Sequence, residues 1–217
     1  MASLSRDKYL VITADQKGSR RQRDRVPDAL DALAQVDCVL PPSRTVGDEI
    51  QLISTDPAAW GQTLEILTRL GGWRLGGGIG AVELPLPDEV PAARGPAFLS
   101  ARDAIESAHA DPAGLDLDDG VSAAGYAGRA AAPQGGALHQ AYVFSCLLEH
   151  LWSRRSAQGW EVIDVIRQVD SGKAAAAHLG ISASAVSQRL RTAGWHASNQ
   201  GLRQLQHHLA VLMAGTE

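Results

Sequence analysis

Two aspartates near the N-terminus have the type and spacing to hold a divalent cation together. Asp15 directly follows an apolar, β-branched segment at residues 9–14, and Asp48 lies in a turn-rich stretch before a second apolar segment at residues 50–54. If these segments pair in one sheet, the two carboxylates lie side by side, where they can bind Mg²⁺ and, through it, a triphosphate. The alternative is that both are capping or turn carboxylates, exposed at the end of the sheet.

A second polar set lies in a predicted helix-turn-helix at residues 172–191. Ala176 precedes Gly180 by four residues and Val186 follows it by six. At these positions two crossing helices need a small side chain, a tight turn and a core anchor. Ser182 is a favourable N-cap for the second helix. The pattern predicts DNA binding, and the alternative is a helical hairpin buried against other helices or used for a protein contact.

The second predicted helix carries small and hydrogen-bonding side chains on the face away from its core anchor. Such side chains suit the major groove of duplex DNA, where glutamine can read adenine and arginine can contact guanine or phosphate. A lysine near the start of the first helix is placed to contact the DNA backbone. The residues that we expect to bind DNA are Lys173, Ser182, Ser184, Ser187, Gln188, Arg189 and Arg191.

Charge is unevenly distributed along the chain. The net charge is −4, yet residues 138–217 hold seven basic and five acidic residues and are the only positive segment. One copy of such a weakly positive segment binds DNA with limited, salt-dependent affinity. We therefore expect a homodimer that presents two copies to double-stranded DNA.

The elements that must position these residues follow from hydrophobic periodicity and turn signals. Apolar runs, helical spacing and glycine or proline breaks predict the order β-α-β-β-α-β, the ferredoxin-like arrangement. We expect strands at residues 9–14, 50–54 and 73–83, extended stretches at 38–40 and 44–46, a hairpin tip at 47–49, and helices at 24–34, 57–70 and 97–108. Several glycines in the last strand would let another backbone or a ligand approach closely.

The sequence predicts an α/β (α+β) fold in two domains. Residues 1–110 form an α/β domain, residues 111–137 an Ala-, Gly- and Asp-rich linker or surface loop, and residues 138–217 an all-α domain that holds the helix-turn-helix. No stretch approaches the apolar length that a membrane span needs, and the N-terminus has no apolar run of signal-peptide type. We therefore expect a cytoplasmic protein without a membrane partner.

Three short stretches of the first domain resemble one family. They are ITADQKGS at residues 12–19, VGDEIQ at 46–51 and GIGAV at 78–82. Over about residues 8–108 the chain resembles the class III nucleotidyl cyclase fold and, more closely, the SatD family, with D..GSR near the start and GDE.Q at the hairpin. The resemblance implies a Mg²⁺-nucleotide site made by Asp15, Gly18, Ser19, Asp48 and Glu49, with Asp15 and Asp48 as the metal ligands.

The chain departs from the cyclases on the later helix. There, cyclases carry an asparagine and an arginine one helical turn apart, which orient the ribose and stabilise charge at the phosphate. This chain has Leu99 with Arg102 or Asp103 and no asparagine, so we expect a nucleotide to be sensed rather than cyclised. A basic run at residues 20–25 either binds phosphate or DNA, or forms a solvated helix face.

Together these features predict a DNA-binding transcriptional regulator. Its N-terminal domain would sense a ligand such as a Mg-nucleotide, or mediate dimerisation, and so change the spacing of two reading helices. Two other classes stay open. One is a metal-dependent nucleotide-processing enzyme with a helical regulatory tail, and the other is a scaffold in which both halves make only protein contacts.

Overall fold

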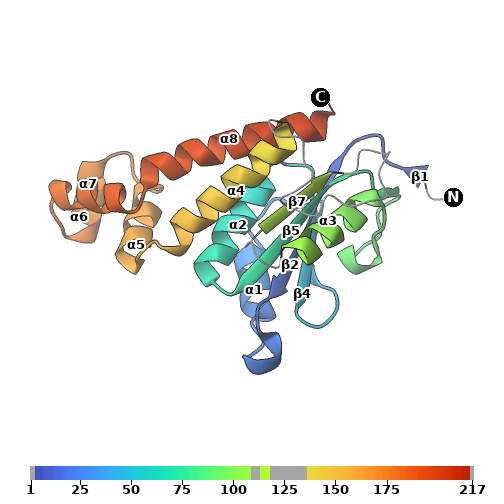
Figure 1. Ribbon diagram of the computed structural model, residues 1–217. Coiled ribbons are helices and arrows are strands. Elements are labelled where there is room, and N and C mark those ends of the chain that lie inside the picture. The colour runs from blue at the N-terminus through green and yellow to red at the C-terminus, as the bar shows by residue number, and fades with distance from the viewer. Residues whose placement is uncertain (1–2, 109–112, 118–135, 216–217) are drawn as a thin grey trace.

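The computed structural model describes residues 3–108, 113–117 and 136–215, which form a mixed α/β structure (Figure 1). The strands are β1 (Ser3–Leu4), β2 (Tyr9–Gln16), β3 (Leu40–Arg44), β4 (Glu49–Ser54), β5 (Trp73–Gly80), β6 (Glu83–Leu84) and β7 (Ala113–Leu117). The helices are α1 (Val26–Leu33), α2 (Ala58–Leu70), α3 (Pro96–Ser107), α4 (Ala137–Ser153), α5 (Ala157–Ile166), α6 (Gly172–Leu179), α7 (Ala183–Thr192) and α8 (Trp195–Ala214), with short 3-10 turns η1 (Ser19–Arg21) and η2 (Val90–Ala92). Within these ranges, none of the helices combines the length and apolar character that a membrane crossing requires.

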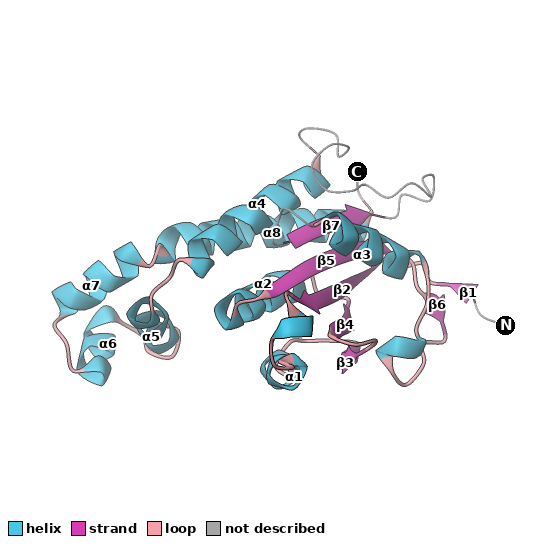
Figure 2. Ribbon diagram, turned by 60° about the horizontal axis from the view of Figure 1, so that its bottom comes forward, coloured by secondary structure: helices cyan, strands magenta, loops and turns pink. Residues whose placement is uncertain are grey.

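Five strands form one sheet in the order β3-β4-β2-β5-β7 (Figure 2). The central strand β2 pairs antiparallel with β4 and β5, whereas β7 pairs parallel with β5 at the edge. Successive side chains of a strand face opposite sides of the sheet. Leu10 and Ile12 belong to a core with α1, α2, α4 and α8, and Val11 belongs to a second core with α3. Because helices cover both faces, β2 is buried along nearly its whole length.

The predicted hairpin is confirmed. β3 and β4 pair antiparallel, and the chain turns between them at Gly47, whose φ of 64° is in the left-handed region that favours glycine. The register of β2 against β4 sets Asp15 opposite Glu49. The tip of the hairpin therefore lies beside the end of the central strand.

Two glycines of β5 let α3 lie directly on the sheet. A Cβ atom built on Gly78 would lie 2.1 Å from the backbone oxygen of Ala97, and one built on Gly76 would lie 2.5 Å from that of Ala101. Only a residue without a side chain leaves room for a helix backbone at this distance. The predicted close approach at this strand is confirmed, and the backbone that approaches is that of α3.

The long helices α4 and α8 lie side by side and pack against α2 (Figures 1 and 2). Their buried leucines belong to the same core as the residues of the sheet. Trp60 of α2 donates a hydrogen bond from Nε1 to the buried Ser145 Oγ of α4 at 2.8 Å. The core therefore runs across residue 138, where the predicted second domain begins.

Helices α5, α6 and α7 form a three-helix unit at the end of α4 and α8 that is far from the sheet (Figure 1). The unit has its own hydrophobic cluster, to which Ala176 and Val186 belong. These two side chains are 7% and 1% exposed, so the small residue and the core anchor predicted from their spacing are confirmed as core positions.

The linker prediction is wrong at residues 113–117. These residues form β7, whose pairing with β5 runs from Leu75 opposite Ala113 to Ile79 opposite Leu117. A parallel edge strand depends on a partner that is distant in sequence, so the composition of the segment alone did not reveal it. Residues 118–135, the greater part of the predicted linker, lie outside the described residues.

Candidate functional site

Asp15 and Asp48 lie together in an open pocket at one end of the sheet. The pocket has a volume of about 510 Å³ and is lined by Asp15, Gln16, Gly18, Ser19, Arg20, Arg21, Asp48 and Arg74. Four of the five residues predicted to bind a nucleotide therefore line one space, which we call the Asp15–Asp48 pocket. The fifth, Glu49, pairs with Asp15 across the strands and accepts a hydrogen bond from Thr45 Oγ1.

The loop that forms one wall of this pocket is held by a buried glutamine. Gln16 is 2% exposed; its Nε2 donates to the carbonyl oxygen of Arg23 at 2.8 Å, and its Oε1 accepts from the backbone N–H of Arg25 at 2.9 Å. Within the loop, Gly18 adopts a φ of 73° at the start of η1. Both ends of the loop are thereby fixed, which places Ser19 beside the carboxylates.

The surroundings of the two carboxylates shift their pKa values in opposite directions. Burial raises the pKa of Asp15 from 3.8 to about 6, and the hydrogen bond and charge of Asp48 add to the effect, against the Arg74 guanidinium 3.7 Å away. Burial also acts to raise the pKa of Asp48, but hydrogen bonds from Ser19 and Asp15 outweigh it, so the net pKa is lowered. The pair therefore holds one proton up to about pH 6.

This pair fits a cation that prefers oxygen ligands. Mg²⁺ is usually held by one or two carboxylates and completes its octahedron with water and phosphate oxygens, so Asp15 and Asp48 would suffice as protein ligands. Among the described residues no group of three or more potential metal ligands occurs, so the remaining positions would belong to water or to the bound molecule. The arginines of the pocket supply positive charge for a phosphate.

The basic run at residues 20–25 divides into separate roles. Arg20 and Arg21 line the Asp15–Asp48 pocket. Arg23 forms an ion pair with Asp28. Arg25 donates to the carbonyl oxygens of the last turn of α2, at 2.6 Å to residue 70 and 2.7 Å to residue 71. Two of these arginines are therefore available to a ligand, and the other two are engaged in structure.

The later helix contributes nothing to the lining of this pocket as the structure describes it. The Leu99 side chain is 66% exposed on α3, and Arg102 pairs with Glu106 one turn along the same helix, at 3.6 Å. The stretch of α3 that the resemblance aligns with the ribose contacts of cyclases therefore does not line this pocket.

The turn between α6 and α7 is capped on both sides. Gly180 has a φ of 64°, and the N–H of Ile181 donates to the carbonyl oxygen of Ala176 at 3.1 Å, which closes the last turn of α6. Ser182 Oγ accepts from the N–H of Ala185 at 3.1 Å, so the predicted N-cap of the second helix is confirmed. These two caps fix the direction in which α7 leaves α6.

Six of the seven residues predicted to bind DNA are exposed: Lys173, Ser182, Ser184, Ser187, Gln188 and Arg191. Arg191 Nη1 donates to Gln188 Oε1 at 3.0 Å, so these two side chains lie together on α7. Ser182 is used by its cap. Arg189 points back to α5 and forms an ion pair with Glu161 at 3.0 Å, which leaves it less suited to contact DNA than its neighbours.

Comparison of the chain with protein-family models, curated protein sequences and solved structures finds no match.

Sequence reasoning missed the residues whose roles depend on distant partners. Gln16 and Arg74 line the pocket, and Arg25 caps α2, because the fold brings β2, β5 and α2 together. Gln16 carries a weak local signal, since it is a polar residue in phase with the buried side of β2. For Arg25 no local pattern distinguishes it from the other arginines of the basic run.

Proposed function

We propose that this protein is a DNA-binding transcriptional regulator in which α6 and α7 form the helix-turn-helix and α7 is the reading helix. The observation that carries the proposal is the exposed polar face of α7, with Ser184, Ser187, Gln188 and Arg191 next to a turn capped at Gly180. In this class the reading helix enters the major groove and uses residues of its N-terminal part to contact bases. The C-terminal end of α7 is attached to the rest of the molecule.

We further propose that the N-terminal half is a ferredoxin-like, cyclase-like domain that senses a Mg-nucleotide or mediates dimerisation. Support comes from the element order β2-α1-β3-β4-α2-β5 and from the antiparallel order β3-β4-β2-β5 in the sheet. Support for the ligand comes from Asp15 and Asp48, which line one pocket and have the carboxylate oxygens that a divalent cation prefers. A homodimer would present two reading helices about 34 Å apart, one turn of DNA, and would compensate for the weak positive charge of one copy.

The proposal predicts salt-sensitive binding to duplex DNA through α7. Selection from a library of randomised duplexes, followed by fluorescence anisotropy on the selected site, measures the affinity. We expect Gln188→Ala combined with Arg191→Ala to weaken specific binding by about tenfold or more, because both side chains are suited to base edges or phosphate.

The matched control is Arg154→Ala, which removes an exposed arginine outside α6 and α7. It should leave the affinity within about twofold of that of the unaltered protein. Absence of salt-sensitive binding, or equal binding by the double variant, would refute the proposal.

A second candidate function is a metal-dependent nucleotide-processing enzyme, favoured by the carboxylate pair and the arginines of the Asp15–Asp48 pocket. It predicts turnover of ATP, GTP, CTP or UTP with Mg²⁺ or Mn²⁺, because the metal would neutralise the phosphates and Arg20 or Arg21 would stabilise charge at the reacting phosphate. Asp15→Asn or Asp48→Asn should abolish the turnover, while Asp31→Asn, an exposed change on α1, should not. If none of the four nucleotides is turned over with either metal, this candidate is excluded.

A further inference from the structure

The three-helix unit is connected to the rest of the molecule by two short segments. α4 ends at residue 153 and α5 begins at 157, while α7 ends at 192 and α8 begins at 195. In the second segment Gly194 has a φ of 65°, a left-handed conformation that suits glycine. The angle between the unit and the sheet is therefore set by the conformation of these two connections and by the side chains that link the unit to the rest of the molecule.

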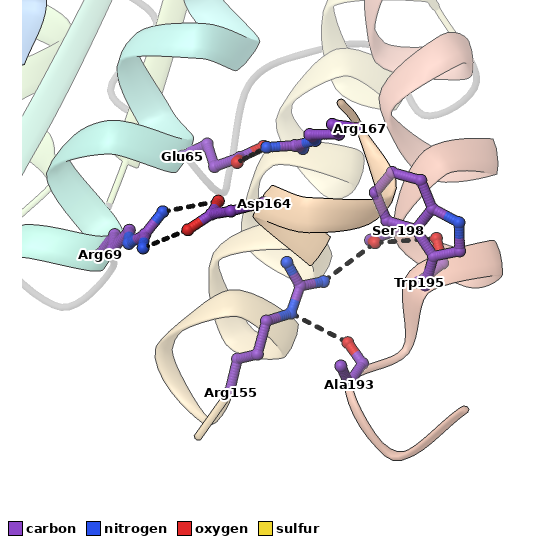
Figure 3. Close-up of polar contacts among 8 residues, drawn as sticks. All are labelled: Glu65, Arg69, Arg155, Asp164, Arg167, Ala193, Trp195 and Ser198. Carbon is purple, nitrogen blue, oxygen red and sulfur yellow. Dashed lines mark hydrogen bonds and ion pairs between the residues drawn. The ribbon is translucent and has the colours of Figure 1, made fainter. Parts of the chain in front are cut away.

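Arg155 lies in the first connection and binds the second (Figure 3). It is 8% exposed. Its Nε donates to the carbonyl oxygen of Ala193 at 2.9 Å, and its Nη2 donates to Ser198 Oγ at 3.0 Å. Its guanidinium carbon lies 4.4 Å from the centre of the Trp160 ring. One side chain thus contacts the first turn of α5, the end of α7 and the first turn of α8.

The chemistry of these contacts favours one orientation of α7. The Ala193 carbonyl belongs to the C-terminal end of α7, where a cation interacts favourably with the helix dipole. A planar guanidinium donates in two fixed directions while stacking on an aromatic ring, which a lysine ammonium cannot do. Rotation of the three-helix unit about its connections would break both hydrogen bonds of Arg155 and leave a buried charge without them, which is unfavourable.

A pair of ion pairs between α2 and α5 holds the same joint from the other side (Figure 3). Arg69 contacts both carboxylate oxygens of Asp164, at 2.9 and 2.6 Å, and Arg167 contacts both oxygens of Glu65, at 2.6 and 2.8 Å. On each helix the acidic and the basic residue lie about one turn apart. A shift of α5 by one turn along α2 would bring like charges together, so the arrangement selects one register.

We infer that Arg155 is the positioning residue that sets the angle of the three-helix unit on the sheet, and that the two α2–α5 ion pairs are a clamp that keeps this angle. The inference rests on the proposed function in one respect: if α7 reads DNA, the angle of this unit determines how α7 is presented to it. The geometry itself is measurable without DNA. The residues of the clamp are Glu65, Arg69, Asp164 and Arg167.

The experiment measures a distance between the unit and the sheet domain. Nitroxide labels are attached at His178→Cys on α6 and Asp31→Cys on α1, both exposed positions, in the full chain with Cys38→Ala and Cys146→Ala. Pulsed electron paramagnetic resonance then gives the distribution of the distance. We expect one narrow distribution for the unaltered joint and a distribution at least about twice as broad for Arg155→Met, and also for Arg155→Lys, because lysine lacks the two directed donors. Arg154→Met, the neighbouring exposed arginine, should leave the distribution narrow.

The clamp offers a second test that does not depend on the folding of an Arg155 variant. Glu65→Arg or Arg167→Glu alone places like charges together and should broaden the distribution, and the two changes combined restore opposite charges and should narrow it again. Circular dichroism confirms that each measured variant is folded. A distribution that stays narrow in folded Arg155→Met, or in Glu65→Arg if Arg155→Met does not fold, would overturn the inference. So would a combined variant as broad as the single ones.

The same variants separate this inference from the proposed function. If the chain binds DNA, Arg155→Lys should weaken binding by about tenfold, although the exposed face of α7 is unchanged. If the chain binds no DNA at all, the proposed function fails, while the distance measurements still decide whether Arg155 and the clamp set the joint.

Discussion

Gly78→Ala is expected to destabilise the protein by about 3 kcal/mol, because its new methyl group meets backbone rather than a side chain that can move. A Cβ atom at this position would lie 2.1 Å from the Ala97 oxygen and 2.3 Å from the Ala101 nitrogen. α3 would have to move away from β5 and open the core on that face of the sheet. Urea unfolding followed by circular dichroism measures the loss as a lower midpoint at an unchanged slope.

The matched control for this change is Gly172→Ala. Gly172 begins α6, has no atom within 4 Å of an added Cβ and has no positive φ. Alanine there should leave stability unchanged or raise it by up to about 1 kcal/mol, because it reduces the freedom of the unfolded chain. If Gly78→Ala unfolds at the same urea concentration as the unaltered protein, α3 does not lie on β5 as described.

Asp15→Asn is expected to stabilise the metal-free protein above pH 6 by about 1 kcal/mol. The pKa of Asp15 is raised by burial and by Asp48 to about 6 in the folded protein, from 3.8. The folded state therefore binds more protons than the unfolded state between about pH 4 and pH 6, so the stability of the unaltered protein falls with rising pH across that window. The side chain is about one third exposed, and solvent screening reduces the effect to the modest figure given.

The measurement is the free energy of unfolding from pH 4 to pH 8 in the presence of EDTA. The advantage of Asp15→Asn over the unaltered protein should vanish near pH 4, where Asp15 is protonated in the folded state. Adding Mg²⁺ should raise the stability of the unaltered protein and not that of Asp15→Asn, because the variant lacks one of the two carboxylates that would hold the cation. Parallel stability curves for Asp15→Asn and the unaltered protein would show that folding does not raise the pKa of Asp15.

The elements that sequence reasoning located well are those defined by local chemistry. The turn at Gly47 and the N-cap at Ser182 each depend on backbone conformation or hydrogen bonds within a few residues. The small residue and the anchor at Ala176 and Val186 follow from helical spacing alone. The carboxylate pair was predicted because the alternation of strand and turn residues already implied that β2 and the hairpin are neighbours.

The features that sequence reasoning missed depend on parts of the chain that are far apart. The edge strand β7 exists through its pairing with β5. Because α4 and α8 cover α2, residues of both predicted domains lie in one hydrophobic core. Arg189 has a side chain of the type that contacts DNA, yet its ion pair with Glu161 turns it toward α5.

The sequence by itself determined the turns, the caps, the sheet-end carboxylates Asp15 and Asp48, and the polar face of α7, because each is encoded by residues within a short stretch of chain. Only the tertiary structure decided how the three-helix unit is held. Arg155 reaches a carbonyl 38 residues away, and Arg167 reaches a carboxylate 102 residues away. Such contacts exist only where the packing of the sheet and of the unit brings residues that are far apart in the sequence together. No local pattern therefore distinguishes these two arginines from exposed ones.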